Sequence, residues 1–338
     1  MQDIKRKIAK KLIIGFDTQT ALKEDHIHRC LLEYSVGGVI LFDKFYNEQT
    51  KSKNIQNPKQ LIELTTQLQN ISKNKLLISI DQEGGKVARL KKEFGFCDSM
   101  SAKEISKSGE EQAKKHYSKL SYELQELGIN LDFAPLVDLG LNKNSDVIYK
   151  LERAYSDNPN IVSKYAEIFM DQLHLHNVIS CLKHFPGHGS AMGDSHEGFV
   201  DVTDTWSENE LEPYKKLLHK TKMIMTAHVF NKNIDEKYPA TLSYNTNTKL
   251  LRESLGYNGV IIGDDLQMGA IKEHFTNEEA LKLSINSGVD FVMYCNQLGN
   301  DSAEEIIDSI YKLVKDGEIS QERIEESNKR IDKLLGDL

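Results

Sequence analysis

Histidines, a lysine and an aspartate gather in one short segment, residues 183–196. Its sequence is Lys-His-Phe-Pro-Gly-His-Gly-Ser-Ala-Met-Gly-Asp-Ser-His, and it follows an apolar run, residues 178–182, that is typical of a buried strand. Glycines and a proline interrupt the segment, which favours a loop over a helix or strand. Histidine exchanges a proton near neutral pH. The segment therefore predicts a site that binds a polar ligand and moves protons.

Polar motifs also follow other apolar runs along the chain. They are Asp81-Gln82-Glu83-Gly84-Gly85, Asp132-Phe133-Ala134-Pro135, Thr226-Ala227-His228 and Gly263-Asp264-Asp265. If the apolar runs are parallel strands of one barrel, all of these motifs lie at the carboxyl-terminal face, which carries the active site in such barrels. We therefore expect them to meet the histidine-rich segment in space.

Short apolar runs alternate with amphipathic stretches over most of the chain. The predicted strands are residues 12–16, 38–42, 76–80, 131–135, 179–185, 223–228, 260–265 and 291–295. The predicted helices are 21–33, 58–71, 102–127, 161–176, 208–220, 246–255, 277–287 and 303–315, with a last charged helix at about 320–335. Strands that alternate with helices indicate an α/β fold with a parallel sheet. Eight such units predict a (β/α)8 TIM barrel. We expect a single domain over residues 1–338, with the barrel at about 12–315.

Composition excludes several classes of partner. The 338 residues carry a net charge of −8, which is not the basic footprint of a nucleic-acid-binding protein. The apolar stretch 12–16 is too short for a signal-peptide core, and no run has the length of a membrane span. The four cysteines are scattered without a C-x-x-C pair, at 30, 97, 181 and 295. We expect a monomeric cytoplasmic protein that binds neither nucleic acid nor membrane.

Two pairs of residues suggest a division of roles. Asp264 and Asp265 are neighbours, so in an extended strand their side chains point to opposite sides. We expect Asp265 to cap the following helix and Asp264 to face the pocket. Asp194 and His196 form a carboxylate–imidazole pair, which suits a proton donor that later accepts a proton. Ser207 and Glu210 have the spacing of a capping box and predict a helix start there.

Metal binding and Schiff-base chemistry are alternatives for the same segment. His184 and His188 have the H-x-x-x-H spacing of a helical zinc site, but Pro186 and Gly187 prevent a helix between them. A metal-dependent hydrolase barrel using His184, His188, His228 and Asp264 remains an alternative. A lysine at a strand end, here Lys183, is also where a barrel aldolase carries its Schiff base.

The motifs together resemble those of family 3 glycoside hydrolases. They are Asp81-Gln82-Glu83-Gly84-Gly85-Lys86-Val87, Lys183-His184-Phe185-Pro186-Gly187-His188-Gly189, Asp194-Ser195-His196 and Gly263-Asp264-Asp265-Leu266-Gln267-Met268, in the family's order from about residue 12 to 300. The chain is most similar to the single-domain bacterial β-N-acetylglucosaminidases of peptidoglycan recycling. The resemblance implies a (β/α)8 barrel and a retaining mechanism.

The resemblance also implies a role for each matching residue. Asp264 matches the family's nucleophile, His196 its acid/base and Asp194 the partner of that histidine. Asp81, Lys183 and His184 match residues that hold the hydroxyls of the terminal sugar. Arg153 resembles the sugar-binding arginine, and Arg89 assists it. The chain departs from the family at Lys86, at Ala154-Tyr155 and at Gly263, where arginine, Ser-Phe and serine or threonine are more common.

The expected activity is therefore exo-hydrolysis of a terminal β-linked GlcNAc. The implied substrate is a muropeptide fragment, GlcNAc-anhydro-MurNAc with or without peptide, and the reaction needs neither a metal nor an organic cofactor. A phosphorylase, a β-glucosidase or β-xylosidase, and a sugar-binding barrel without activity remain alternatives. Glycines 187, 189 and 193 predict that the loop carrying His196 moves.

Overall fold

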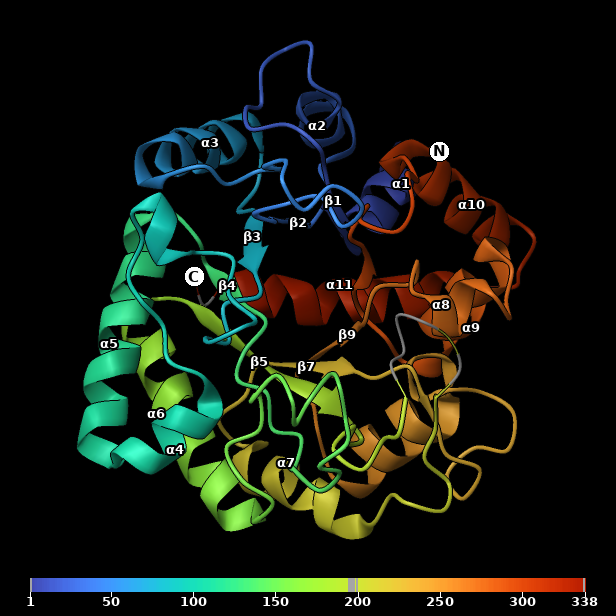
Figure 1. The fold of residues 1–338 in the computed structure, drawn as a ribbon. Helices are drawn as coiled ribbons and strands as arrows, with labels where there is room; N and C mark the ends of the chain where they lie inside the picture. Colours follow the sequence, from blue (N-terminus) through green and yellow to red (C-terminus); the bar gives the residue numbers. More distant parts are fainter. Residues whose placement is uncertain (1, 194–197, 199, 337) are drawn as a thin grey trace.

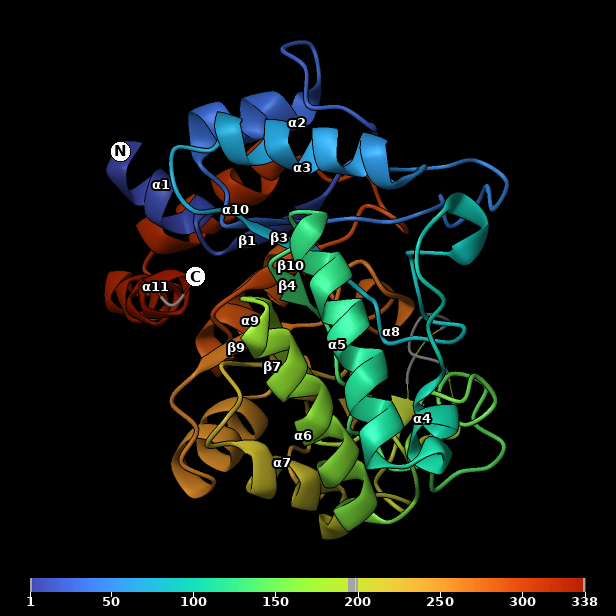
Figure 2. The same cartoon turned by 90° about the vertical axis from the view of Figure 1, so that its left-hand side faces the viewer.

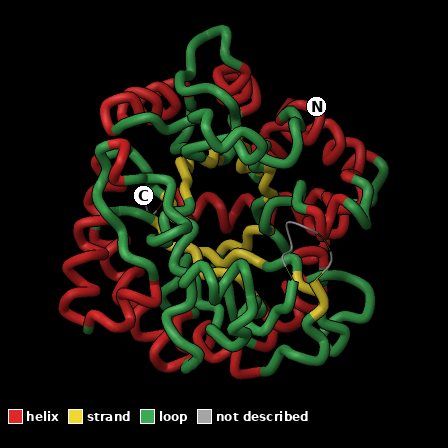
Figure 3. The backbone as a smooth tube through the Cα atoms, in the orientation of Figure 1, coloured by secondary structure: helices red, strands yellow, loops and turns green. Residues whose placement is uncertain are grey.

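Parallel strands form a ring at the centre of the protein (Figures 1 and 3). The computed structural model describes residues 2–193, 198, 200–336 and 338. Within that part of the chain, eight strands pair in the order β10-β1-β2-β3-β4-β5-β7-β9. They are β1 (Leu12–Gly15), β2 (Gly38–Ile40), β3 (Leu77–Ile80), β4 (Leu131–Asp132), β5 (Ile179–Phe185), β7 (Met223–Thr226), β9 (Val260–Gly263) and β10 (Val292–Tyr294). A parallel bridge between Ile262 and Phe291 joins β9 to β10 and closes the ring. The predicted (β/α)8 barrel is confirmed.

Helices lie around this ring, and one of them, the last, crosses its end (Figures 2 and 3). They are α1 (Gln2–Ala9), α2 (His26–Arg29), α3 (Pro58–Ile71), α4 (Ala102–Ser108), α5 (Glu110–Glu126), α6 (Pro159–Leu175), α7 (Glu212–Leu217), α8 (Gly269–Lys272), α9 (Asn277–Ser287), α10 (Ala303–Lys315) and α11 (Gln321–Gly336). Further segments are 3-10 or π-helical: η1 (Cys30–Tyr34), η2 (Lys92–Phe94), η3 (Glu208–Leu211), η4 (Ala240–Leu242) and η5 (Asn245–Ser254). A separate small sheet pairs β6 (Val200–Asp201) with β8 (Val229–Phe230). In the described part of the chain, no helix is both long and apolar enough to cross a bilayer.

Local sequence signals explain where several helices begin and end. The Asn57 side chain accepts a hydrogen bond from the Gln60 backbone N–H, and Pro58 occupies the first turn of α3. Capping boxes start α9 at Thr276 and α10 at Ser302. The predicted helix 102–127 is wrong as a single element, because Gly109 adopts φ +86° and separates α4 from α5. Glycine permits this left-handed geometry without a Cβ penalty.

The last helix closes one end of the barrel. Ile331, Leu334 and Leu335 of α11 pack with the apolar side chains that fill the barrel interior, and Figure 1 shows α11 passing behind the ring of strands. The buried Asp290, just before β10, accepts hydrogen bonds from Arg323 and Arg330 of α11. Ion pairs and apolar packing therefore hold α11 against the amino-terminal end of the strands, opposite the face where their carboxyl ends open.

Candidate active site

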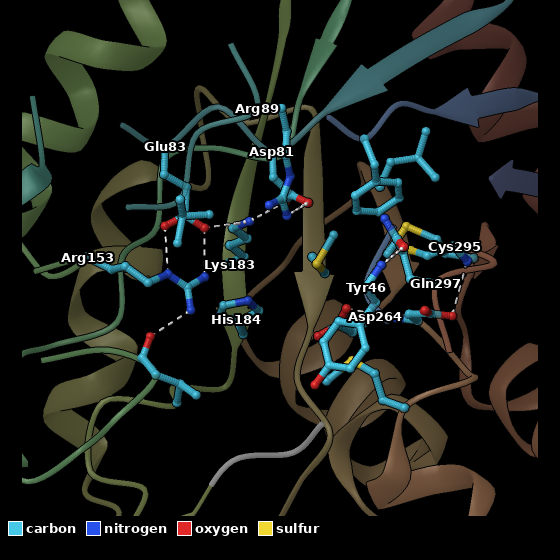
Figure 4. Close-up of a pocket in the computed structure, with 18 of the residues that line it drawn as sticks. Tyr46, Asp81, Glu83, Arg89, Arg153, Lys183, His184, Asp264, Cys295 and Gln297 are labelled. Carbon is cyan, nitrogen blue, oxygen red and sulfur yellow. Dashed lines mark hydrogen bonds and ion pairs between the residues drawn. The ribbon is translucent and has the colours of Figure 1, made fainter. Parts of the chain in front are cut away.

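A cavity of about 410 Å³ opens at the carboxyl-terminal ends of the strands (Figure 4). Its wall includes the predicted substrate-binding residues and the predicted nucleophile, which are Asp81, Arg89, Arg153, Lys183, His184 and Asp264. Apolar and sulfur-containing side chains, among them Phe42, Met225, Met268 and Cys295, line other parts of it. A concave pocket in which polar groups converge beside apolar side chains is the usual form of a small-molecule site.

Two acids just after β3 bind three cations, one from the same segment and two from elsewhere in the barrel. Lys183 Nζ, on β5, lies 2.8 Å from Asp81 Oδ1 and 2.7 Å from Glu83 Oε1. Arg153 donates from Nε and Nη2 to the two oxygens of Glu83, at 2.8 and 2.7 Å. Arg89 Nη2 donates to Asp81 Oδ2 at 3.3 Å. Figure 4 shows these five side chains as one continuous network along one side of the cavity.

The network holds its groups in their charged forms. Burial acts to raise the pKa of Glu83, but Arg153 and Lys183 outweigh it and lower this pKa to about 2. Lys183 and Arg89 likewise hold the pKa of Asp81 below its usual range, against the effect of burial. Burial acts to lower the pKa of Lys183, yet Asp81 and Glu83 raise it above its usual range. A Schiff-base lysine needs a readily available neutral amine, so this environment disfavours the aldolase alternative for Lys183.

A carboxylate that sequence reasoning did not single out holds His184, near the end of β5, and His188, in the loop that follows. Asp138 Oδ2 lies 2.7 Å from His184 Nδ1, and Asp138 Oδ1 accepts the His188 backbone N–H at 2.8 Å. Burial acts to raise the pKa of Asp138, but His184 and His188 keep it below its usual value. A carboxylate on one ring nitrogen fixes the orientation of the imidazole and leaves the other nitrogen for a ligand.

His188 contributes a neutral imidazole to the cavity wall. Burial lowers its pKa to about 4, so the ring is uncharged at neutral pH. Among the described residues, no group hydrogen-bonds to its Nδ1 atom. The ring centroids of His184 and His188 are 5.9 Å apart. Sequence reasoning placed His188 in the histidine-rich motif but gave it a role of its own only in the metal-site alternative.

The two aspartates after β9 have different environments. Asp264 lines the cavity, and its Oδ1 accepts the backbone N–H of Asp265 at 2.8 Å. Asp265 Oδ1 accepts the backbone N–H groups of Gln267 and Cys295, at 3.1 and 3.3 Å. Asp265 therefore caps the turn after β9 and not the helix itself, because α8 begins only at Gly269. Burial raises the pKa of Asp265 to about 6. Both aspartates border the cavity, and Asp265 is the more buried of the two.

A second buried carboxylate, Glu210, supports the loop after β5 from the other side. The predicted capping box is wrong, because the Ser207 side chain makes no capping bond and Glu210 turns toward the loop. Gly189 N–H donates to Glu210 Oε2 at 2.9 Å, and the Ser190 hydroxyl donates to Oε1 at 2.6 Å. Gly187 adopts φ +126°, and a Cβ there would lie 2.6 Å from Glu210 Cβ. Glycine is therefore needed for the close approach of the loop to Glu210.

The predicted acid/base pair lies outside the described residues. Asp194 and His196 both belong to the range 194–197, for which the structure gives no description. Their roles and the predicted motion of the loop stay predictions.

The ligand set of the metal-dependent alternative is not assembled. His228 Nε2 lies 2.8 Å from the Asp265 carbonyl oxygen, and His184 Nδ1 faces Asp138. Over the described ranges, no three or more His, Cys, Asp or Glu side chains are grouped so that they could hold a metal ion.

The comparison with known families agrees with this geometry. The model of the glycosyl hydrolase family 3 N-terminal domain matches residues 4–334. The chain belongs to glycosyl hydrolase family 3. The match spans all eight strands and every residue of the ion-pair network, so the network lies within the family 3 barrel itself.

Relatives of this family 3 chain carry names that concern hexosamine glycosides. A stretch of 329 residues is 35% identical to beta-hexosaminidase A of Pseudoalteromonas piscicida and covers 89% of this chain and 53% of that protein. Beta-hexosaminidase of Idiomarina loihiensis is 33% identical over 268 residues, with 78% and 77% of the two chains covered. A solved family 3 beta-N-acetylglucosaminidase from Paenibacillus sp. str. FPU-7 superimposes with a TM-score of 0.88 and 30% identity, over 99% of this chain and 62% of that one. This chain thus spans about half to three fifths of two of these relatives, and the single-domain organisation stays a prediction.

Proposed function

We propose that this chain is an exo-acting, retaining β-N-acetylglucosaminidase that removes a terminal β-linked GlcNAc. The observation that carries the proposal is the buried Asp81–Lys183–Glu83–Arg153 network that lies across the cavity from Asp264. Ionised groups make stronger hydrogen bonds than neutral ones, so such a network suits the hydroxyls of one sugar ring. The names of the family 3 relatives support the choice of GlcNAc.

In the proposed reaction, Asp264 attacks the anomeric carbon and the glycosidic bond breaks. His196, oriented by Asp194, gives its proton to the leaving oxygen, so the aglycone departs as a neutral alcohol. A water molecule then attacks the covalent glycosyl-enzyme and transfers a proton to His196, which restores Asp264 as a carboxylate. Two displacements at one carbon retain the β configuration. The roles of Asp194 and His196 rest on the resemblance of the Asp-Ser-His motif to the family pattern.

The natural substrate that we propose is a fragment of peptidoglycan, GlcNAc-anhydro-MurNAc with or without peptide. The support is the resemblance of the Lys183–Gly189 segment and the Asp-Ser-His motif to those of bacterial peptidoglycan-recycling enzymes. A monomer that acts in the cytoplasm belongs to the same proposal.

The first experiment compares aryl β-GlcNAc with aryl β-glucoside and aryl β-xyloside in phosphate-free buffer. We expect turnover of the GlcNAc substrate, release of β-GlcNAc as the first product by NMR, and no effect of a chelator. Preference for glucose or xylose would overturn the sugar assignment. Turnover that starts only when phosphate is added, with GlcNAc 1-phosphate as product, would make the protein a phosphorylase. Loss of turnover with the chelator would favour the metal-dependent alternative.

A matched pair of variants connects this activity to the cavity. Asp264→Ala should abolish turnover. Asp98→Asn removes an exposed aspartate that pairs with the exposed Lys92 at 3.1 Å, and should leave turnover unchanged. Normal activity in Asp264→Ala would exclude Asp264 as the nucleophile.

A further inference from the structure

The cavity wall opposite the ion-pair network carries an exposed aromatic side chain, Tyr46. It lies in the segment between β2 and α3, and its side chain lines the cavity although the residue is 48% exposed. Gln49 and Gln297 line the same wall. In Figure 4, Tyr46 and Gln297 lie on one side of the cavity, and Glu83, Arg153 and Lys183 lie on the other.

The backbone at Tyr46 is tied to the segment that follows β10. Gln297 Oε1 accepts the Tyr46 backbone N–H at 2.9 Å, and Gln297 Nε2 donates to the Lys44 carbonyl oxygen at 3.0 Å. Gln49 Nε2 also donates to the Tyr46 carbonyl oxygen, at 2.8 Å. Both backbone polar groups of Tyr46 are thereby bonded, so the ring projects from a fixed point of the wall.

Buried polar groups anchor the base of the same segment. Lys53 is fully buried, and its Nζ lies 3.1 Å from Asp17 Oδ1 and also donates to the Asn296 carbonyl oxygen. The Asn54 side chain accepts from the Phe42 backbone N–H at 3.0 Å. An anchored backbone beneath an exposed ring lowers the conformational entropy that is lost on binding, because a tyrosine on a fixed segment has few rotatable bonds left to order.

The position of Asp264 indicates which part of a substrate meets Tyr46, given the function proposed above. The network binds hydroxyls of the terminal sugar, and the anomeric carbon lies at Asp264, which Figure 4 places toward the Tyr46 side. Whatever is attached to the anomeric carbon must then extend beyond Asp264, away from the network. The wall that carries Tyr46 borders that space.

We propose that Tyr46 is a specificity-determining residue that packs against the aglycone ring of the substrate. A pyranose ring has an apolar face of C–H groups, and a tyrosine ring offers a flat apolar surface with a hydroxyl at its tip that can stay in water. The partner class is therefore a second sugar ring, or another flat group, linked to the terminal GlcNAc. Tyr46 takes no part in bond breaking and acts only on the affinity for the aglycone.

The test uses one substrate with an aglycone ring and one without. The first is the disaccharide of two β-1,4-linked GlcNAc residues, and the second is GlcNAc β-fluoride, whose leaving group is a single atom. Tyr46→Ala should lower kcat/KM for the disaccharide by about tenfold, the size expected when one ring-on-ring contact is lost. The same variant should change kcat/KM for the fluoride by less than about twofold, because no aglycone contact exists to lose.

Two further variants serve as controls. Tyr46→Phe keeps the ring and should retain the wild-type preference for the disaccharide. Tyr244→Ala removes a tyrosine of similar exposure, 49%, that is not part of the cavity wall. It should leave kcat/KM for both substrates unchanged. An equal loss with both substrates would place Tyr46 against the terminal sugar and overturn the proposal, as would no loss with the disaccharide.

A binding measurement separates this inference from the proposed function. In an Asp264→Asn background, calorimetry compares GlcNAc with the disaccharide, with and without Tyr46→Ala. If the wild-type protein hydrolyses neither substrate but Tyr46→Ala weakens binding of the disaccharide alone, the proposed hydrolysis fails and the role of Tyr46 holds. If the disaccharide binds no more tightly than GlcNAc, both with Tyr46 present and with Tyr46→Ala, the role of Tyr46 is refuted whatever the activity.

Discussion

Arg153 and Glu83 form a two-point ion pair, although 70 residues separate them in the chain. Each carboxylate oxygen of Glu83 receives one guanidinium N–H, at 2.8 and 2.7 Å, and one of these oxygens also lies 2.7 Å from Lys183 Nζ. Glu83 thus links the segment after β4 to β5 in one wall of the cavity. Because the pair is buried, neither partner can be removed without leaving a charge uncompensated.

Glu83→Gln should damage both stability and substrate binding. The change leaves Arg153 and Lys183 with one carboxylate fewer in a buried site, which typically costs about 3–5 kcal/mol of unfolding free energy. We also expect a higher KM, because the cations that face the sugar hydroxyls lose their alignment. Chemical denaturation and steady-state kinetics measure the two effects. Glu110→Gln, which removes an exposed ion pair with Lys164, serves as the control and should change neither quantity appreciably.

The pH dependence of stability should differ between two buried glutamates. The pKa of Glu83 is lowered to about 2, so its contribution to stability is present above the unfolded value of 4.5 and is lost as the pH falls toward 2. The pKa of Glu210 is raised to about 7 by burial, so its contribution is present below 4.5 and is lost as the pH rises through 7.

Glu210→Gln therefore should reduce the fall in stability between about pH 4.5 and 7. An amide can accept the Gly189 N–H and donate to the Ser190 hydroxyl oxygen, so the loop keeps both hydrogen bonds. Between pH 5 and pH 8, the unfolding free energy of the variant should rise relative to that of the wild type by at most about 3 kcal/mol, which follows from the size of the pKa shift. Urea unfolding at a series of pH values measures it. Parallel stability profiles for the variant and the wild type would show that Glu210 does not titrate in this range.

Azide should rescue an enzyme that lacks its nucleophile. With Asp264→Ala, we expect kcat for aryl β-GlcNAc to fall by at least about a thousandfold, as for other removed nucleophiles. A small anion that enters the vacated space can attack the anomeric carbon directly, in one displacement, and gives the α-glycosyl azide. NMR of the product reads the configuration. Formation of the β-azide instead would mean that a second residue acts as the nucleophile.

Asp290 should matter for stability and not for chemistry. It lies at the opposite end of the barrel from the cavity, where Arg252, Arg323 and Arg330 all donate to its carboxylate. Asp290→Asn leaves three guanidinium groups with a neutral partner, and we expect a loss of about 3–5 kcal/mol of unfolding free energy. At temperatures where the variant stays folded, kcat and KM should be those of the wild type. Asp308→Asn, in an exposed pair with Lys5, is the control for charge removal alone.

Strand positions were readable in the sequence because each strand is buried on both faces. The largely apolar run at residues 178–182 has no solvent-facing side, and the structure places most of it in β5, which is buried over its whole length. Helices 58–71, 277–287 and 303–315 also match, since an amphipathic period and strong caps mark them. Helix α1 and the β6–β8 sheet were not predicted: α1 is short and highly charged, and each strand of the small sheet has only two residues.

The sequence by itself determined which residues could do chemistry. Asp81, Lys183 and Asp264 stand directly at strand ends, and in a parallel barrel all strand ends meet at one face. Only the tertiary structure decided which partners these residues have. Glu83 with Arg153, and Asp138 with His184, are pairs between different segments of the barrel, so their distances depend on how the ring closes. Local patterns likewise assigned Glu210 to a helix cap, whereas in the folded chain it accepts hydrogen bonds from Gly189 and Ser190 of the loop after β5. Hydrophobic periodicity specifies where a strand lies, but an ion pair across the barrel is set by three-dimensional packing that no short sequence window contains.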